Sequence, residues 1–266
     1  MATYTAGFIG AGNMGGALAA AACKSVDPAQ VIAADRDTDK AATLAAACGC
    51  ATGDNEKVVH NSRFVFLGVK PQMLSDVAAE LKPLLTDRTV IVSMLAGVTT
   101  ERLANELGER PIIRIMPNTP VAIGEGMILY TANAAVSEMD KAAFVQLLSA
   151  AGQLDEIPET LIDAGCAVSG CGPAFVYLFV EALADAGVKC GLSRETALRY
   201  AAQTVCGAGH MAVVDERHPA ALREAVCSPG GSTIEGVRVL EQDAALRGLV
   251  EDAVKASFER TKELGK

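Results

Sequence analysis

The sequence contains no tryptophan, few aromatic residues and only three histidines. Aromatic residues make up 4% of its 266 positions, whereas 50% are hydrophobic and 25 are glycine, so its core has to be packed from small aliphatic side chains. His60, His210 and His218 are far apart and form no H-x-x-x-H pair, which argues against a histidine metal site. The absence of G-x-S-x-G and of G-K-[ST] argues against a serine hydrolase and a P-loop nucleotidase.

Positive charge is also scarce, since 23 basic side chains face 32 acidic ones and the net charge is -9. A nucleic-acid-binding protein needs a basic face for phosphates, so we expect no nucleic-acid partner, and by the same reasoning no anionic membrane surface. No run of 18 apolar residues is free of glycine, proline and charge, so we expect no membrane-spanning helix. The first ten residues lack a basic segment followed by an apolar one, which predicts a cytoplasmic location.

The eight cysteines include no C-x-x-C pair. In a reducing cytoplasm we expect them to remain thiols. The pair Cys48 and Cys50 alone offers too few ligands for zinc. The sequence therefore predicts that the cysteines are small core residues and that the protein holds no metal.

Two kinds of secondary structure divide the chain. Short apolar runs that predict strands alternate with helical segments as far as residue 159, which indicates βαβ units and a parallel sheet, and segments 126–132 and 153–157 could add edge strands. After that point only helices are expected, at 174–186, 194–216, 219–226, 233–242 and 244–264. We therefore predict an α/β Rossmann-type domain at residues 1–160 and an all-α domain at residues 161–266.

A G-x-G-x-x-G motif runs from Gly10 to Gly15, after an apolar strand and before a helix. In this position the first glycine permits a tight turn, the second lets the backbone approach a pyrophosphate, and the third lets helix and strand pack closely. The helix N-terminus then offers free N–H groups to the phosphates. The motif predicts a dinucleotide site that binds an anion in an acidic protein.

The choice between the two nicotinamide cofactors stays open at the end of the second strand. Asp35 there favours NAD, because a carboxylate accepts the ribose hydroxyls, whereas the adjacent Arg36 favours NADP. Further residues at the ends of later strands are expected beside the cofactor, because ligands bind at the carboxyl ends of parallel strands. These are Lys70, Ala96, Gly97 and, in a loop stiffened by two prolines, Asn118.

A second glycine-rich segment, Ser228–Thr233, lies between two predicted helices and begins the second of them. Backbone N–H groups and hydroxyls that converge at such a point can bind a small carboxylate. Glu216 and His218 lie just before this helical pair. The segment predicts an anionic substrate.

Several motifs together resemble the pyrroline-5-carboxylate reductase family: GFIGAGNMG (7–15), GVKP (68–71), AGVT (96–99), MPNTP (116–120), SGCGPAFVY (169–177), EALADAGVK (181–189) and HPAALREAVCSPGGSTIEGVRVLE (218–241). The resemblance extends over nearly the whole chain, and its last segment is highly specific. It implies hydride transfer from NADPH or NADH to the C=N bond of 1-pyrroline-5-carboxylate, which gives L-proline. It also implies that the helical half forms homodimers, which often assemble into decamers, with both chains building the site.

The resemblance assigns roles to individual residues. Thr233 would lie near the ring nitrogen of the substrate, and Glu216 matches a family glutamate at the substrate site. The substrate carboxylate would be held by Ser228, Gly230, Gly231 and Thr233. The cofactor would be bound by Ile9, Gly10, Ala11, Gly12, Asn13, Met14, Asp35, Arg36, Asn55, Val69, Lys70, Pro71, Ala96, Gly97 and Asn118.

Three alternatives remain. A reductase of another cyclic imine acid would differ only in the shape of its pocket. A β-hydroxyacid dehydrogenase shares the domain order but needs a lysine on its long central helix, and residues 165–188 contain none. A non-catalytic NADP-binding protein should lack the carboxylate-binding segment. Cys171 and Phe175 stand where the family often has hydroxyl-bearing residues, so any polar role at these two positions is in doubt.

Overall fold

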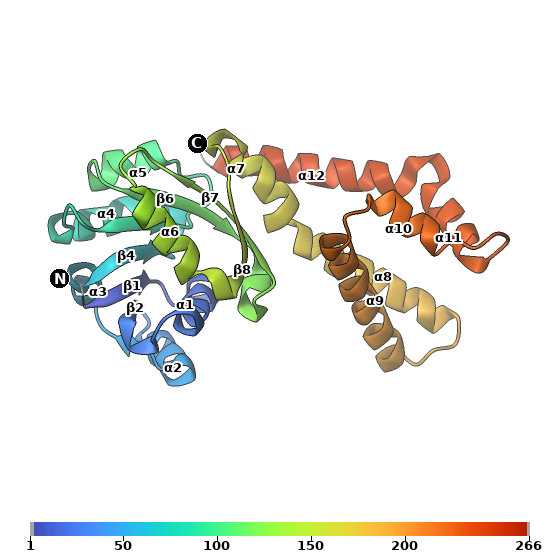
Figure 1. The fold of residues 1–266 in the computed structure, drawn as a ribbon, viewed down its shortest axis with the longest axis horizontal. Coiled ribbons are helices and arrows are strands. Elements are labelled where there is room, and N and C mark those ends of the chain that lie inside the picture. Colours follow the sequence, from blue (N-terminus) through green and yellow to red (C-terminus); the bar gives the residue numbers. More distant parts are fainter. Residues whose placement is uncertain (1–2, 265–266) are drawn as a thin grey trace. The chain divides into compact units, whose positions relative to one another are not determined.

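The computed structural model describes residues 3–264 and separates the chain into two compact units (Figure 1). The first unit comprises the residues up to Gly170 together with those from Ser257 onward, and the second comprises Cys171–Ala256. Helix α7 (Glu159–Gly165) and a π-helical turn (Cys166–Gly170) therefore belong to the first unit. The change of secondary structure expected at residue 160 precedes this division by ten residues.

The first unit is built on one eight-stranded sheet with the order β3-β2-β1-β4-β5-β6-β7-β8. Strands β1 to β6 are parallel, β7 runs antiparallel to β6, and β8 runs parallel to β7. This is the doubly wound order, in which the chain reverses its direction across the sheet between β1 and β4. The strands are β1 (Tyr4–Ile9), β2 (Val31–Ala34), β3 (Ala51–Thr52), β4 (Ser62–Leu67), β5 (Val90–Ser93), β6 (Ile112–Pro117), β7 (Gly126–Ala132) and β8 (Gly152–Glu156).

Helices cover both faces of this sheet because alternate strand residues point to opposite sides. Phe8 and Phe66 stack with ring centroids 4.3 Å apart on the face covered by α1 and α6, whereas Val65 and Leu67 point to the face covered by α3, α4 and α5. The helices of this unit before α7 are α1 (Asn13–Ser25), α2 (Thr38–Cys48), α3 (Asn55–Asn61), α4 (Leu74–Leu81), α5 (Thr100–Leu107) and α6 (Glu138–Leu147). Strands form at both of the later segments predicted as edge strands, although only β8 lies at the edge of the sheet and β7 lies between β6 and β8. The short β3 and the helix α6 were not predicted.

A buried arginine ties β6 to α7. The side chain of Arg114 is 2% exposed and donates to Glu159 Oε1 at 3.2 Å and to Asp163 Oδ1 at 2.9 Å. Glu159 also accepts hydrogen bonds from the backbone N–H and the hydroxyl of Thr100, the first residue of α5. One ion-pair network thus fixes three elements at the edge of the first unit.

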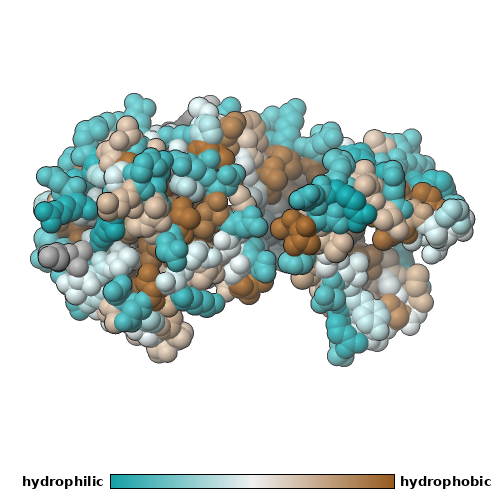
Figure 2. Space-filling view, viewed as in Figure 1, coloured by the Kyte–Doolittle hydropathy of each residue, from teal (hydrophilic) through white to brown (hydrophobic). Residues whose placement is uncertain are grey.

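The second unit consists of helices whose ends lie within three residues of the predicted ones: α8 (Gly172–Lys189), α9 (Arg194–Val214), α10 (Pro219–Ala225), α11 (Ser232–Glu241) and the first part of α12 (Ala245–Leu264). Its own buried cluster is small, since it contains only Ala184, Ala197 and Ala201, with Val180 and Val188 packed against it. By contrast, of the 22 exposed large hydrophobic side chains among the described residues, 18 belong to this unit, and some are visible as brown patches in Figure 2. Such an apolar surface marks an interaction face.

One helical stretch, Glu159–Lys189, is long and apolar enough to cross a membrane by length and composition alone. The sequence did not predict this stretch, because glycine, proline and charged residues interrupt its apolar run. Only 11% of its most apolar window is buried within the chain. Helices that pack into an interface between subunits meet the same criterion, so this stretch by itself says little about a membrane.

Candidate active site

A cavity of about 570 Å³ opens where the carboxyl ends of β1, β2 and β4 meet, which is the point where the strand order reverses. This is the position at which doubly wound sheets bind nucleotides, and the volume suits a small-molecule site. The cavity is lined by Ile9, Gly10, Gly12, Ala34, Asp35, Arg36, Lys40, Asp54, Asn55, Gly68, Val69, Lys70, Met73, Val77 and Glu80.

The glycines of the first motif are required by close backbone packing. Gly10 has a φ of 103°, donates to the Ala34 carbonyl at 2.8 Å, and approaches the Gly68 carbonyl so closely that a Cβ would not fit. A Cβ on Gly15 would collide with the carbonyl oxygen of Gly10. The close approach of Gly10 to Gly68 and of Gly15 to Gly10 holds the loop between β1 and α1 against the strand ends.

Gly12 has a different reason to be glycine, because a Cβ there would meet no protein atom within 4 Å. The space beside it is therefore free for a ligand. Gly12 is also the N-cap of α1, has extended backbone angles, and provides no side-chain cap for the first N–H groups of the helix. The unpaired donors and the open space together fit the pyrophosphate of a dinucleotide.

The Asp35 carboxylate is already bound by the protein backbone. Its Oδ2 accepts from the Ala11 N–H at 2.7 Å, and its Oδ1 accepts from the Asp37 N–H at 2.9 Å. Asp35 thereby fixes the glycine loop against the end of β2. Arg36 lines the same cavity, is exposed, and has no ion pair among residues 3–264. Lys40 lies there too, and its ammonium group is 3.6 Å from Asp37.

Eight of the predicted cofactor residues line this cavity: Ile9, Gly10, Gly12, Asp35, Arg36, Asn55, Val69 and Lys70. The others, which are outside its lining, are Ala11, Asn13, Met14, Pro71, Ala96, Gly97 and Asn118. Sequence reasoning missed Lys40, Asp54 and Gly68. For Gly68 a signal was present, because it precedes Val69 and Lys70 in the GVKP motif and contacts Gly10 directly.

Asn118 makes two hydrogen bonds within the protein. Its Nδ2 donates to the Ser169 carbonyl at 3.0 Å, and its Oδ1 accepts from the Met127 N–H at 2.9 Å. It is 9% exposed. Asn118 therefore joins the loop after β6 to β7 and to the π-helical turn, and a direct contact of its amide with the cofactor stays a prediction.

A second helix N-terminus of the same kind lies in the helical unit. Gly231 is the N-cap of α11, with extended backbone angles and no side-chain cap. Gly230 has a φ of 68°, and the Gly231 N–H donates to the Ser228 carbonyl at 3.0 Å, so residues 228–231 form a tight turn. Thr233 is the second residue of α11 and is exposed. Within the described residues, α1 and α11 are the only α-helices with glycine at the N-cap.

Glu216 lies in the connection between α9 and α10 and is exposed. The residues on either side of it are fixed: Arg217 donates two hydrogen bonds to the Asp215 carboxylate, which lowers the pKa of Asp215 to about 2, and His218 caps α10 through Nδ1. Glu216 itself has no hydrogen bond or ion pair among residues 3–264 and is free to bind a ligand.

The doubly wound sheet, its glycine loop and the cavity at the reversal point define a nicotinamide-dinucleotide-dependent oxidoreductase. Comparison with known families supports this class. A family described as NADP oxidoreductase, coenzyme F420-dependent, matches residues 5–97, and a family described as pyrroline-5-carboxylate reductase dimerisation matches residues 159–264.

Individual proteins narrow the class. The chain is 39% identical to pyrroline-5-carboxylate reductase of Pisum sativum, with 98% of this chain and 96% of that protein covered, and 39% identical to the Escherichia coli enzyme, with 98% of each covered. The solved structure from Coxiella burnetii is 36% identical with a TM-score of 0.92 and covers 99% of each chain. The structure of the Plasmodium falciparum enzyme with NADP bound is 32% identical with a TM-score of 0.86 over 100% of each chain. The chain belongs to the pyrroline-5-carboxylate reductase family.

Proposed function

We propose that the protein transfers a hydride from NADPH to the C=N carbon of 1-pyrroline-5-carboxylate and releases L-proline. The observation that carries the proposal is the pair of glycine-capped helix N-termini, one in each unit, in a member of this family. The first suits the pyrophosphate of the cofactor, and the second suits the carboxylate of the substrate.

In this reaction the protein would bind the cofactor and the substrate, orient them, and supply one proton to the substrate. Bound reduced nicotinamide supplies the hydride, so the chain needs no nucleophile. The N–H groups at the start of α11 would hold the carboxylate and so fix which face of the ring is presented. The Thr233 hydroxyl would donate a hydrogen bond to the ring nitrogen. The proton that this nitrogen gains, as the C=N carbon gains the hydride, would come from solvent through that hydroxyl. Glu216 would contact the substrate at the same site.

The preference for NADPH over NADH rests on Asp35, Arg36 and Lys40. Both oxygens of Asp35 already accept backbone N–H groups, so this carboxylate is less available to ribose hydroxyls. Arg36 is unpaired within the described chain, and Lys40 is held only by an exposed ion pair. Two such cations favour a 2′-phosphate.

The apolar surface of the helical unit favours a homodimer, because this unit buries only three alanines in its own core. We further propose that dimers assemble into decamers, as the family resemblance implies, and that the protein acts in the cytoplasm. Light scattering coupled to size-exclusion chromatography tests the assembly. A monomer at micromolar concentration would contradict the role given to this surface.

The activity is tested by following loss of NAD(P)H absorbance with pyrroline-5-carboxylate and, separately, with a six-membered cyclic imine acid. We expect turnover with the five-membered substrate, and better turnover with NADPH than with NADH. No turnover with either cofactor would contradict the proposed reaction, and a preference for the six-membered ring would reassign the substrate.

The proposed role of Thr233 has its own test. Replacing Thr233 with Val keeps the shape and removes the hydroxyl, so kcat/KM should decrease about 10- to 100-fold. Thr233→Ser keeps the hydroxyl and should retain most activity. NADPH affinity should remain unchanged in both variants, and equal activity of Val and Ser variants would remove the hydroxyl from the mechanism.

A further inference from the structure

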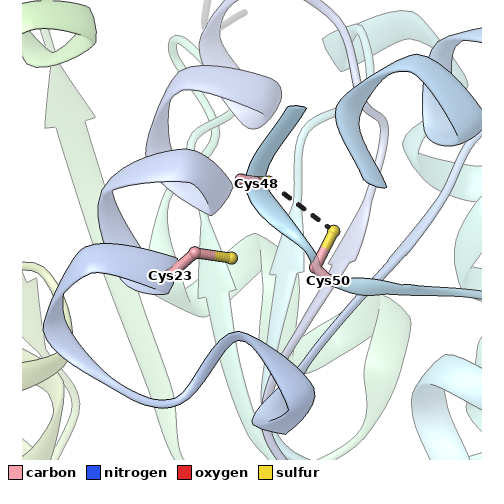
Figure 3. Close-up of side chains that lie close together, drawn as sticks. All are labelled: Cys23, Cys48 and Cys50. Carbon is pink, nitrogen blue, oxygen red and sulfur yellow. Dashed lines mark hydrogen bonds between the residues drawn. The ribbon is translucent and has the colours of Figure 1, made fainter. Parts of the chain in front are cut away.

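Three cysteines of the first unit meet at one point, far from each other in the sequence. Cys23 lies near the end of α1, Cys48 is the last residue of α2, and Cys50 precedes β3. Their three sulfur atoms lie within 4.8 Å of one another, and Figure 3 shows the three side chains close together. The sequence offered Cys48 and Cys50 as a pair too small for a metal, and the fold adds the third thiol.

The backbone brings these thiols together by a specific turn. Gly49 ends α2 with a φ of 78°, a left-handed conformation that suits glycine, and its N–H donates to the Ala45 carbonyl. The chain reverses there, so Cys48 and Cys50 face each other instead of pointing apart. Cys23 and Cys50 are buried, while Cys48 is half-buried beside the exposed Gly49, which leaves a route from solvent.

The spacing of the Cys48 and Cys50 sulfur atoms matches that of two ligands around one metal ion, and Cys23 lies within 4.8 Å of both. A zinc–sulfur bond of about 2.3 Å with tetrahedral angles places neighbouring sulfurs about 3.8 Å apart. The Cys48 and Cys50 sulfurs are 3.8 Å apart. A disulfide bond would require about 2.05 Å, so these two thiols are not covalently joined and their sulfur atoms stay available as ligands.

We propose that Cys23, Cys48 and Cys50 form a binding site for one divalent thiophilic cation, with zinc as the natural candidate. Thiolate ligands select soft cations. A divalent ion leaves three thiolates with a net charge of about -1, whereas a monovalent ion leaves about -2, and burial opposes the larger charge. No histidine or carboxylate joins this group within residues 3–264, so a four-coordinate zinc ion would take its fourth ligand from water.

The three thiols also interact with one another. Hydrogen bonds from Cys23 and from Cys48 lower the pKa of the Cys50 thiol, although its burial acts in the opposite direction, and the same contact raises the pKa of Cys23. A metal ion bound among them would favour loss of the thiol protons, because its positive charge stabilises thiolates.

The site has a structural role. Cys23 is ten residues beyond Asn13, so it lies about 15 Å along α1 from the glycine loop. Cys50 precedes β3, at the amino ends of the parallel strands, while the dinucleotide cavity is at their carboxyl ends. Bound metal would join the ends of α1 and α2 to the start of β3 without contacting the cofactor.

The test uses the full-length protein, reduced and stripped of metal, and titrated anaerobically with Zn²⁺ or Cd²⁺. We expect one equivalent of metal per chain after desalting, thiolate-to-cadmium charge-transfer absorption, and a rise in Tm of about 5 °C or more. Affinity for NADPH should change less than twofold. Substoichiometric metal bound by the fully reduced protein would overturn the proposal.

Substitutions identify the ligands. Cys50→Ser and the half-exposed Cys48→Ser should each reduce metal affinity at least tenfold, while Cys190→Ser, at an exposed cysteine in the helical unit, should bind metal as the parent does. Retained NADPH binding shows that each variant is folded. Metal binding of unchanged affinity in folded Cys48→Ser and Cys50→Ser would show that the cluster is not the site.

Discussion

The cofactor preference can be tested at Arg36, which lines the cavity without a protein partner among the described residues. A charge-assisted hydrogen bond to a phosphate contributes about 1.5–3 kcal/mol. Arg36 is exposed, so water and salt screen its charge and the lower value applies. Replacing Arg36 with Ala should therefore weaken NADPH binding about tenfold, because about 1.4 kcal/mol corresponds to a factor of ten.

NADH lacks the 2′-phosphate, so its affinity for Arg36→Ala should stay within about threefold of the parent. The matched control is Arg102→Ala, which removes the same charge from an exposed position on α5, outside the cavity. Dissociation constants for both cofactors, measured by fluorescence titration at fixed salt, provide the comparison. Adding Lys40→Ala should weaken NADPH binding by up to another factor of ten if the two cations act independently.

The result that would refute this reasoning is an equal loss of affinity for NADH and NADPH in Arg36→Ala. It would mean that the guanidinium contacts the adenine or the ribose and not a 2′-phosphate. A parent enzyme that binds NADH more tightly than NADPH would contradict the preference itself. In that case Asp35 would have to accept ribose hydroxyls while it still holds the Ala11 N–H. Each carboxylate oxygen has a second lone pair with which it could do so.

Three further substitutions test the supports of the site. Gly15→Ala places a methyl group against the Gly10 carbonyl, so dinucleotide affinity should decrease about 100-fold. The control is Gly16→Ala, whose Cβ would be 3.3 Å from its nearest neighbour, and its dinucleotide affinity should stay within a few-fold of the parent. Similar titration curves for the two variants would contradict the packing argument. Arg114→Met should lower the free energy of unfolding in urea by about 2–4 kcal/mol, and an unchanged midpoint would show that the buried pairs contribute nothing net. Asn118→Ala removes two backbone contacts and should cost about 1–3 kcal/mol in the same assay, and a loss of cofactor affinity without a loss of stability would restore its direct role.

The parts of the fold that could be predicted are those whose signal is local. Strands such as β4 are apolar runs buried on both faces, as in 64–67, and a glycine motif after β1 or a proline after β4 marks the helix that follows. Helix α6 was missed because its apolar face is weak and its clearest signal is the cap at Ser137, which accepts from the Asp140 N–H. Strand β3 has two residues, too few for any pattern to show.

The site divides in the same way. The glycine loop was predictable because the backbone conformation itself requires glycine at Gly10 and Gly15. Lys40 was not, because nothing in a solvent-exposed helix start distinguishes it until the fold brings it beside Arg36. The three thiols show the limit most clearly, since 24 residues separate Cys23 from Cys48 and only the packing of α1 against α2 brings them together.

An acidic protein that binds anions has to rely on donors other than its overall charge. Residues 1–162 carry 12 basic and 18 acidic side chains, and residues 163–266 carry 11 and 14, so neither half attracts a phosphate or a carboxylate at long range. Backbone N–H groups solve this problem, because they carry no formal charge and do not titrate. Glycine at the N-cap leaves those N–H groups available, whereas a serine such as Ser193 of α9 accepts from one of them within the chain. Gly12 and Gly231 are the glycine N-caps among the described α-helices, and neither gives the first N–H groups of its helix a side-chain partner.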